Sequence, residues 1–170
     1  MLKLLMMATT ESIIFRKEPE HKKITVIRQY DAPVQEVWNA WTKSDTLDQW
    51  WAPKPWKART KSMDFRPGGS WLYVMQGPDG TQQWSRFDFA SVEPQEQFSG
   101  TDGFTDADGE INKALPQLHW TNTFKAAGKG TSVEIVIDFP SKEDVDKILE
   151  MGFEQGFTAG LQNLEDLLAG

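Results

Sequence analysis

The C-terminal segment 141-SKEDVDKILEMGFEQGFTAGLQNLEDLL-168 decides the fold that we predict for this chain. Ser141, with Asp144 three residues later and Pro140 just before it, resembles a capping box at a helix start. Apolar and small residues then recur at three- and four-residue steps, which places them on one helix face. We therefore predict one long C-terminal helix with a single stripe. The stripe comprises Val145, Ile148, Leu149, Gly152, Phe153, Gly156, Phe157, Gly160, Leu161, Leu164, Leu167 and Leu168.

Upstream of this helix, between residues 56 and 139, the apolar period changes to two, which is typical of β-strands. Turn sequences such as Pro67-Gly68-Gly69 and Pro78-Asp79-Gly80 join several of these segments. Because a parallel crossover needs about a dozen residues or more, such short joints predict antiparallel neighbours. We interpret the polar stretch 102–116 as a loop. The predicted strands are 56–65, 70–76, 82–92, 97–101, 118–125 and 131–139.

The N-terminal half supplies one more strand and two short helices. Residues 24–30 alternate as a strand does, and Asp31-Ala32-Pro33 stops that strand and starts a helix. Ser44 is suited to cap a second short helix. The order predicts an α+β fold in which a curved antiparallel sheet wraps around the C-terminal helix. We assign 24–170 to this domain and 1–23 to an N-terminal extension, in which residues 13–15 add an edge segment.

Composition excludes several classes of function. The 170 residues contain no Cys, which removes disulfides, thiol catalysis and Cys-based zinc or iron–sulfur sites. The net charge of -7 argues against nucleic-acid binding, which needs a surplus of Lys and Arg. No apolar run is long enough to span a bilayer, and the start MLKLLMM lacks a cleavage pattern. We expect a cytoplasmic protein without metal, because His21 and His119 form no cluster, and without a cofactor.

Aromatic residues carry the functional hypothesis. The chain has eight Trp, most of them between Trp38 and Trp84, and ten Phe. They indicate either a filled core or an aromatic-walled cavity. Gly152, Gly156 and Gly160 leave a groove along the helix, which admits either a close-packed strand or a ligand. The residues that we predict to line a ligand site are Trp38, Trp41, Trp50, Trp71, Tyr73, Phe87, Phe89, Trp120, Asn122, Phe124, Met151 and Phe157.

Residues for catalysis are few. No Ser, His and acid combination forms a recognisable motif, and only Asn122, Asp88 and Tyr73 are candidates for an acid or base in the cavity. Asp88 is also predicted to pair with Arg86 on the strand face opposite Phe87. The acidic residues between Asp102 and Glu110 do not match a calcium-binding loop, so we interpret them as a solvated loop.

Five segments follow a known pattern: Tyr30-Asp31-Ala32-Pro33, Trp50-Trp51-Ala52-Pro53, Arg66-Pro67-Gly68-Gly69, Val74 to Gly80 and the helix that begins near Gln155-Gly156-Phe157. They resemble those of activator of Hsp90 ATPase homologue 1-like proteins, a START-like, helix-grip family. The resemblance implies a seven-stranded sheet around the last helix, with a hydrophobic cavity between them. The chain departs from the family pattern at Ala52, where Gly is usual, and at Phe157, where Trp is common.

Three functions remain open. The first is binding of a small apolar or aromatic molecule in an internal cavity. The second is an enzyme of the cyclase or hydrolase type that uses the same cavity, because the wider superfamily includes lipid and hormone carriers as well as polyketide cyclases. The third is an interaction module with a chaperone partner, as the family name implies. A second copy of the chain is a further candidate partner, in a homodimer, and the sequence does not decide whether the homodimer forms.

Overall fold

The computed structural model describes residues 13–170. Residues 1–12, with the MLKLLMM start and the first part of the predicted extension, lie outside the described residues. The strands are β1 (Ile13–Glu18), β2 (Lys23–Tyr30), β3 (Lys57–Met63), β4 (Ser70–Gln76), β5 (Gln82–Glu93), β6 (Gln97–Thr105), β7 (Leu118–Ala127) and β8 (Gly130–Asp138). The helices are the 3-10 turn η1 (Pro19–His21), α2 (Val34–Thr42), α3 (Ser44–Trp50), α4 (Lys142–Glu150) and α5 (Phe153–Ala169).

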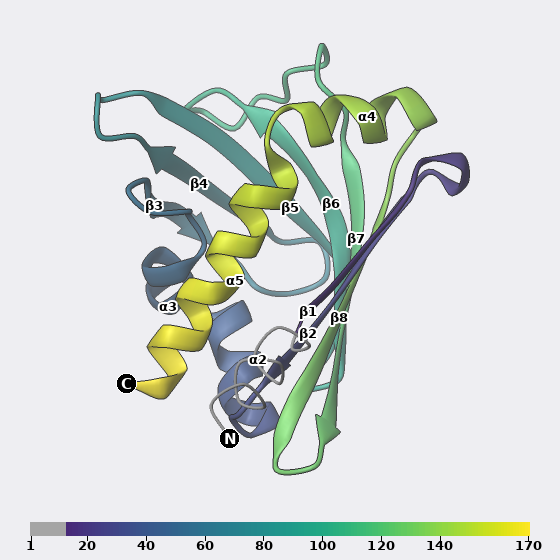
Figure 1. Ribbon diagram of the computed structural model, residues 1–170. Coiled ribbons are helices and arrows are strands. Elements are labelled where there is room, and N and C mark those ends of the chain that lie inside the picture. The colour runs from purple at the N-terminus through teal and green to yellow at the C-terminus, as the bar shows by residue number, and fades with distance from the viewer. Residues whose placement is uncertain (1–12) are drawn as a thin grey trace.

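All the strands form one antiparallel sheet in the order β1-β2-β8-β7-β6-β5-β4-β3. The sheet curves, α5 crosses its concave side, and α2 and α3 close one end (Figure 1). The predicted helix-grip α+β fold is therefore confirmed. Gly68 and Gly80 adopt φ values of 86° and 88° in their turns, a conformation that glycine reaches without a steric penalty.

Within the described residues the sheet has eight strands, one more than the resemblance implies, because β1 pairs with β2 from Ile13↔Arg28 to Glu18↔Lys23. Residues 13–15, the predicted edge segment, lie in β1. No helix in the described part of the chain, 13–170, is long and apolar enough to cross a bilayer.

The prediction of one continuous C-terminal helix is wrong. The Ser141 hydroxyl accepts a hydrogen bond from the Asp144 amide at 3.1 Å, so the predicted helix start is confirmed. The helix then ends at Glu150, and Gly152 adopts a left-handed φ of 88° before α5 begins. A left-handed residue cannot continue an α-helix, so the chain turns there. As a result α4 lies across the end of the sheet and α5 along its concave face (Figure 1).

The prediction that residues 102–116 form a loop is wrong for its first part. Strand β6 continues to Thr105, with Asp102 opposite Leu118 on β7. Phe98, Gly100, Asp102 and Phe104 share one face of β6 because alternate residues of a strand point the same way. An Asp and two Gly in this stretch obscured the alternation in the sequence.

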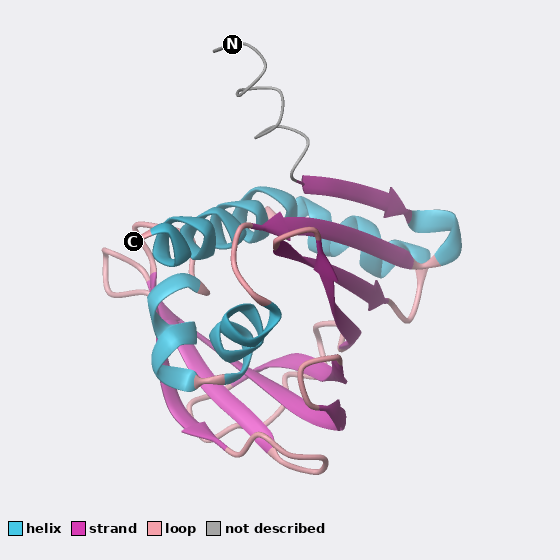
Figure 2. Cartoon of the chain, turned by 90° about the horizontal axis from the view of Figure 1, so that it is seen from below, coloured by secondary structure: helices cyan, strands magenta, loops and turns pink. Residues whose placement is uncertain are grey.

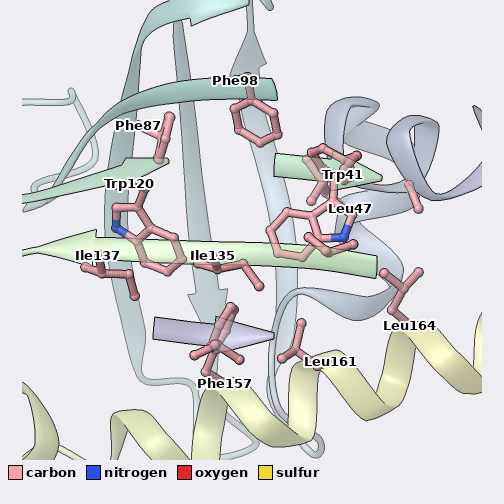
Figure 3. Close-up of a cluster of buried hydrophobic side chains, with 14 of the residues drawn as sticks. Trp41, Leu47, Phe87, Phe98, Trp120, Ile135, Ile137, Phe157, Leu161 and Leu164 are labelled. Atoms are coloured by element: carbon pink, nitrogen blue, oxygen red, sulfur yellow. The ribbon is translucent and has the colours of Figure 1, made fainter. Parts of the chain in front are cut away.

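Helix α5 lies over the open side of the curved sheet (Figure 2), and buried side chains of both elements belong to one core cluster. Phe157, Leu161 and Leu164 extend from α5 toward the sheet, where Trp120 and Ile135 are among the side chains that they approach (Figure 3). Leu161, Leu164 and Ile135 have no exposed surface. At roughly 25 cal/mol per Å2 of buried apolar surface, this interface is a main source of stability.

Helix α3 is held against both α2 and α5. The Trp50 indole N–H donates to the Ala40 carbonyl at 2.9 Å, and the Asn163 amide donates to the Ala52 carbonyl at 2.9 Å. A Cβ at Gly160 would lie 3.2 Å from the Trp51 carbonyl oxygen. The space at Gly160 is therefore taken by the end of α3, and neither a strand nor a ligand occupies it.

Candidate functional site

A pocket of about 240 Å3 opens between the concave sheet face and the junction of α4 with α5. We name it the helix-junction pocket. Strands β4 to β7 form one wall, and α4, α5 and the Met151-Gly152 link form the other. It is lined by Trp51, Pro53, Tyr73, Met75, Gln83, Ser85, Asp102, Gly103, Phe104, Pro116, Leu118, Trp120, Ile148, Met151, Gly152, Phe153, Gly156 and Phe157.

Trp51 separates this pocket from a smaller void deeper in the core. Its ring meets Tyr73 at a centroid distance of 6.4 Å and Phe157 at 6.0 Å on the pocket side, and it meets Trp120, which lines both spaces, at 6.2 Å. The second void measures about 20 Å3, and we name it the inner void. It is lined by Trp41, Leu47, Trp51, Met63, Trp71, Phe87, Phe89, Phe98, Trp120 and Asn122.

The predicted ligand-site residues divide into three groups. The first, on the helix-junction pocket, comprises Tyr73, Trp120, Met151 and Phe157. The second lines the inner void and comprises Trp41, Trp71, Phe87, Phe89 and Asn122, with Trp120 shared between both. The third, which lines neither space, comprises Trp38, Trp50 and Phe124.

The third group fills the core. Trp38 packs edge-on against Phe124 with a centroid distance of 5.1 Å, and both side chains are buried. Trp50 has 1% of its surface exposed. Its neighbour Trp51, which was not among the predicted site residues, holds the position between the two spaces. A one-residue step along a helix turns a side chain by about 100°, and sequence spacing alone did not show which of the two Trp faces the pocket.

Asp102 is the principal polar group of the pocket, and sequence reasoning missed it because it placed this residue in a solvated loop. Burial raises the pKa of the Asp102 carboxyl to about 7, against an ordinary value near 3.8. The Leu118 amide donates a hydrogen bond to it at 3.3 Å, which opposes that shift. The Trp120 indole N–H also favours the charged carboxylate, although it makes no hydrogen bond to a described residue. The two-residue alternation from Phe98 onward was the available signal.

Tyr73 lies beside this carboxyl group. Burial raises the pKa of the Tyr73 hydroxyl above its ordinary value, and the nearby Asp102 carboxylate raises it further. Interactions with the side chains of Trp51 and Ser85 act in the opposite direction. Tyr73 is thus a neutral hydrogen-bonding group at physiological pH.

The other two predicted catalytic candidates lie elsewhere. Asp88 faces away from the pocket, where it accepts a hydrogen bond from Arg86 Nε at 2.9 Å and another from the Ser70 hydroxyl at 2.6 Å. The predicted Arg86–Asp88 pair is confirmed. Asn122 is 1% exposed on the inner void, and its Oδ1 has no hydrogen-bond partner among the described residues.

In the acidic loop after β6, a carboxylate forms hydrogen bonds with backbone amides of the same loop. The Asp106 carboxylate accepts hydrogen bonds from the amides of Asp108 at 2.9 Å and Glu110 at 3.0 Å. Among residues 13–170, no three His, Asp or Glu side chains come together as a metal site requires.

Comparison with known proteins identifies the family. The model of the family described as "Activator of Hsp90 ATPase homolog 1-like protein" matches residues 31–169. The chain belongs to this family. The match confirms the resemblance noted in the sequence, and it spans the whole helix-junction pocket.

Solved structures of similar proteins share the fold of this family member. A protein from Arthrobacter aurescens is 29% identical, with a TM-score of 0.88 over 93% of this chain and 92% of that one. Protein Ms6760 from Mycobacterium smegmatis is 28% identical, with a TM-score of 0.85 over 92% of this chain and 96% of that one. A protein from Staphylococcus epidermidis is 26% identical, with a TM-score of 0.80 over 91% and 93% of the two chains. No curated protein matches the sequence.

The two departures of this member of the Hsp90 ATPase activator-like family lie at or beside the pocket. Phe157 lines it, stacked on Phe153 at a centroid distance of 5.2 Å and edge-on to Trp120 at 5.5 Å. The family resemblance implies a Trp at this position, and a Phe ring is smaller than an indole. Ala52 is buried behind Trp51 and accepts the hydrogen bond from Asn163.

Proposed function

We propose that this protein binds a small apolar or aromatic molecule in the helix-junction pocket. The observation that carries the proposal is the pocket itself, with a volume of about 240 Å3 and with Trp51, Tyr73, Trp120 and Phe157 around it. A cavity of about 150 Å3 already holds benzene, so this space suits a ring with a short substituent. Burial of the guest would supply the affinity, at roughly 25 cal/mol per Å2 of apolar surface.

Two glycines support this proposal because they keep side chains out of the pocket. Gly152 and Gly156 both lie on its wall. A Cβ at Gly156 would meet only Pro53 Cγ, at an ordinary contact distance of 3.8 Å. Since Gly costs about 1 kcal/mol relative to Ala inside a helix, a glycine here lowers helix stability and leaves open space in return.

The test is a titration with indole, followed by Trp fluorescence and by calorimetry. We expect saturable binding to the wild-type protein. Gly156→Leu should fill the pocket and weaken binding by about tenfold or more, while the helix gains stability. Gln155→Leu is the matched control, because Gln155 is exposed on the same helix. Binding that Gly156→Leu leaves unchanged would contradict the proposal.

A catalytic function of the cyclase or hydrolase type is the second candidate, and Asp102 is the observation that favours it. A carboxyl group whose pKa is about 7 can both accept and donate a proton near neutral pH, as a general acid or base must. Asp102→Asn should then abolish turnover of a cyclisable or hydrolysable substrate without loss of its binding. A pure binding protein shows no turnover in either form.

The chaperone partner that the family name suggests is a separate proposal. It is tested with purified Hsp90 and the full chain, with and without a saturating pocket ligand. An interaction that uses the outer surface of the sheet persists when the pocket is filled. Whether the chain forms a homodimer is measured in the same preparation by light scattering.

A further inference from the structure

The charge of the helix-junction pocket restricts what it can hold. Among the described residues that line it, Asp102 is the one charged side chain, and there is no Lys, Arg or His. The opposite wall contributes Ile148, Met151 and Phe153, which carry no charge either. A guest with a negative group would therefore meet a carboxylate and no compensating cation.

The surroundings of Asp102 are aromatic. Tyr73 and Trp120 are close enough to affect or be affected by its charge, and Phe104 lies two residues along on the same face of β6. Aromatic faces attract cations, most strongly where water is excluded. Tyr73, Phe104 and Trp120 line the same pocket as the carboxylate, so a positive group that pairs with Asp102 lies among aromatic rings as well.

One polar group in the wall makes no hydrogen bond within residues 13–170. The Trp120 indole N–H is buried, lines the pocket and makes no hydrogen bond to a described residue. The indole N–H is near enough to the Asp102 carboxyl to favour its charged form, but it makes no hydrogen bond to it. The Asp102 carboxylate accepts only the Leu118 amide among the hydrogen bonds described, so it can accept another from a ligand that enters between α5 and the sheet.

We infer that the ligand is a lipophilic amine, whose apolar or aromatic body fills the pocket and whose protonated nitrogen pairs with the Asp102 carboxylate. This inference rests on the proposed function and names the ligand class of that same site. A neutral alcohol can also donate a hydrogen bond to Asp102, but it gains nothing from the aromatic faces and leaves the carboxylate charge uncompensated. A carboxylic acid of the same size is repelled.

The experiment compares three probes with the same phenyl body, namely 2-phenylethylamine, 2-phenylethanol and 3-phenylpropanoate. Each is titrated into the full chain by calorimetry at pH 8, where Asp102 is mostly ionised. We expect the amine to bind about tenfold more tightly than the alcohol, and the carboxylate to bind most weakly.

Two variants then test whether the Asp102 charge causes the preference for the amine. Asp102→Asn keeps the shape of the side chain and removes its charge, and it should reduce amine affinity to that of the alcohol. Affinity for the alcohol should change by no more than about twofold, which also shows that the variant is folded. Asp108→Asn is the matched control, because it removes an equal charge from the exposed loop just after β6.

The outcomes test the ligand class separately from binding in the pocket. An amine that binds no better than the alcohol overturns the ligand class while pocket binding stands. The ligand class is also overturned if Asp102→Asn still binds the amine more tightly than the alcohol. The same holds if Asp108→Asn removes this preference to the same extent as Asp102→Asn does. If none of the three probes binds, and indole does not bind either, the proposed function fails and this inference fails with it.

Discussion

At Asp102 a carboxyl group lies in a largely apolar pocket, where a neutral side chain would cost less free energy to bury. Its native pKa is about 7 because of burial, whereas an unfolded chain leaves it near 3.8. The native state therefore holds this proton more tightly than the unfolded state does. From about pH 4 to pH 7 this difference lowers the free energy of unfolding as pH rises, and above pH 7 the loss is constant. Tyr73, the other titratable group on the pocket lining, stays neutral over this range.

Asp102→Asn is accordingly expected to stabilise the protein, and more at pH 8 than at pH 5. One pKa unit corresponds to about 1.4 kcal/mol, so the gain should grow by about 2.5 kcal/mol between these values. Urea unfolding at both pH values measures it. Asp108→Asn serves as control, and a gain that is equal at pH 5 and pH 8 would show that burial does not perturb Asp102 in this way.

Asn122 is a second residue whose chemistry is at odds with its surroundings. Its Oδ1 is buried beside the inner void without a partner among the described residues. An unsatisfied buried polar group costs about 1–3 kcal/mol. Asn122→Leu should therefore leave stability unchanged or raise it by about 1 kcal/mol. Thermal unfolding measures the change, and a clear decrease in melting temperature would mean that the amide makes interactions worth more than its burial costs.

At the scale of elements, the link between α4 and α5 forms the mouth of the pocket. Met151, nearly half exposed, and Gly152 both lie on its lining. The left-handed backbone at Gly152 changes the direction of the chain, so that α4 crosses the end of the sheet. If the chain stayed helical through this link, α4 would extend the line of α5 and would not bring Ile148 to the pocket.

Two glycines four residues apart should respond in opposite ways to alanine. Gly152 has a φ of 88° with open space where a Cβ would lie, so Gly152→Ala is expected to lose about 1 kcal/mol through backbone strain alone. Gly156 is helical, so Gly156→Ala should gain up to about 1 kcal/mol. Guanidinium unfolding of both variants provides the comparison. Equal effects in the two would contradict the helix break.

At the scale of the whole molecule, two ion pairs connect the first two strands to α5, one at each end of that helix. Lys17 on β1 pairs with Glu154 at 2.7 Å, and Arg28 on β2 pairs with Glu165 at 2.6 Å. The side chains differ in exposure: 44% for Lys17 but 4% for Arg28. The Tyr30 hydroxyl adds a bond of 3.4 Å to the Leu161 carbonyl near the buried pair.

This difference in burial predicts unequal contributions to stability. Glu165→Gln should cost about 1–3 kcal/mol, because it removes the counter-charge of a buried guanidinium. Glu154→Gln should change stability by less than about 0.5 kcal/mol, as exposed pairs do. Both variants lose one negative charge from the same helix, so each is the control for the other in thermal unfolding. A larger loss in Glu154→Gln would contradict the argument.

The sequence by itself determined the type and order of most elements. Alternation along 24–30 and 70–76, the Ser141 cap and the stripe on α5 are local patterns, and local periodicity follows directly from backbone geometry. The short Gly-containing joints determined the antiparallel pairing, and the same segments carried the family resemblance. The candidate core aromatics were likewise visible, because a period of two or 3.6 shows which residues share a face.

Only the tertiary structure decided which aromatic residues fill the core and which face a space. Trp50 and Trp51 are adjacent in sequence, yet one is packed against Ala40 and the other separates two cavities. The sequence also gave no sign that α4 and α5 separate at Gly152, because glycine is tolerated within helices as well as at their ends. A pocket lies between elements distant in the chain, and local patterns cannot show where side chains from several elements leave room. Asp102 belongs to the site because β6 and β7 pair around it and α5 covers it, which are contacts that no local pattern encodes.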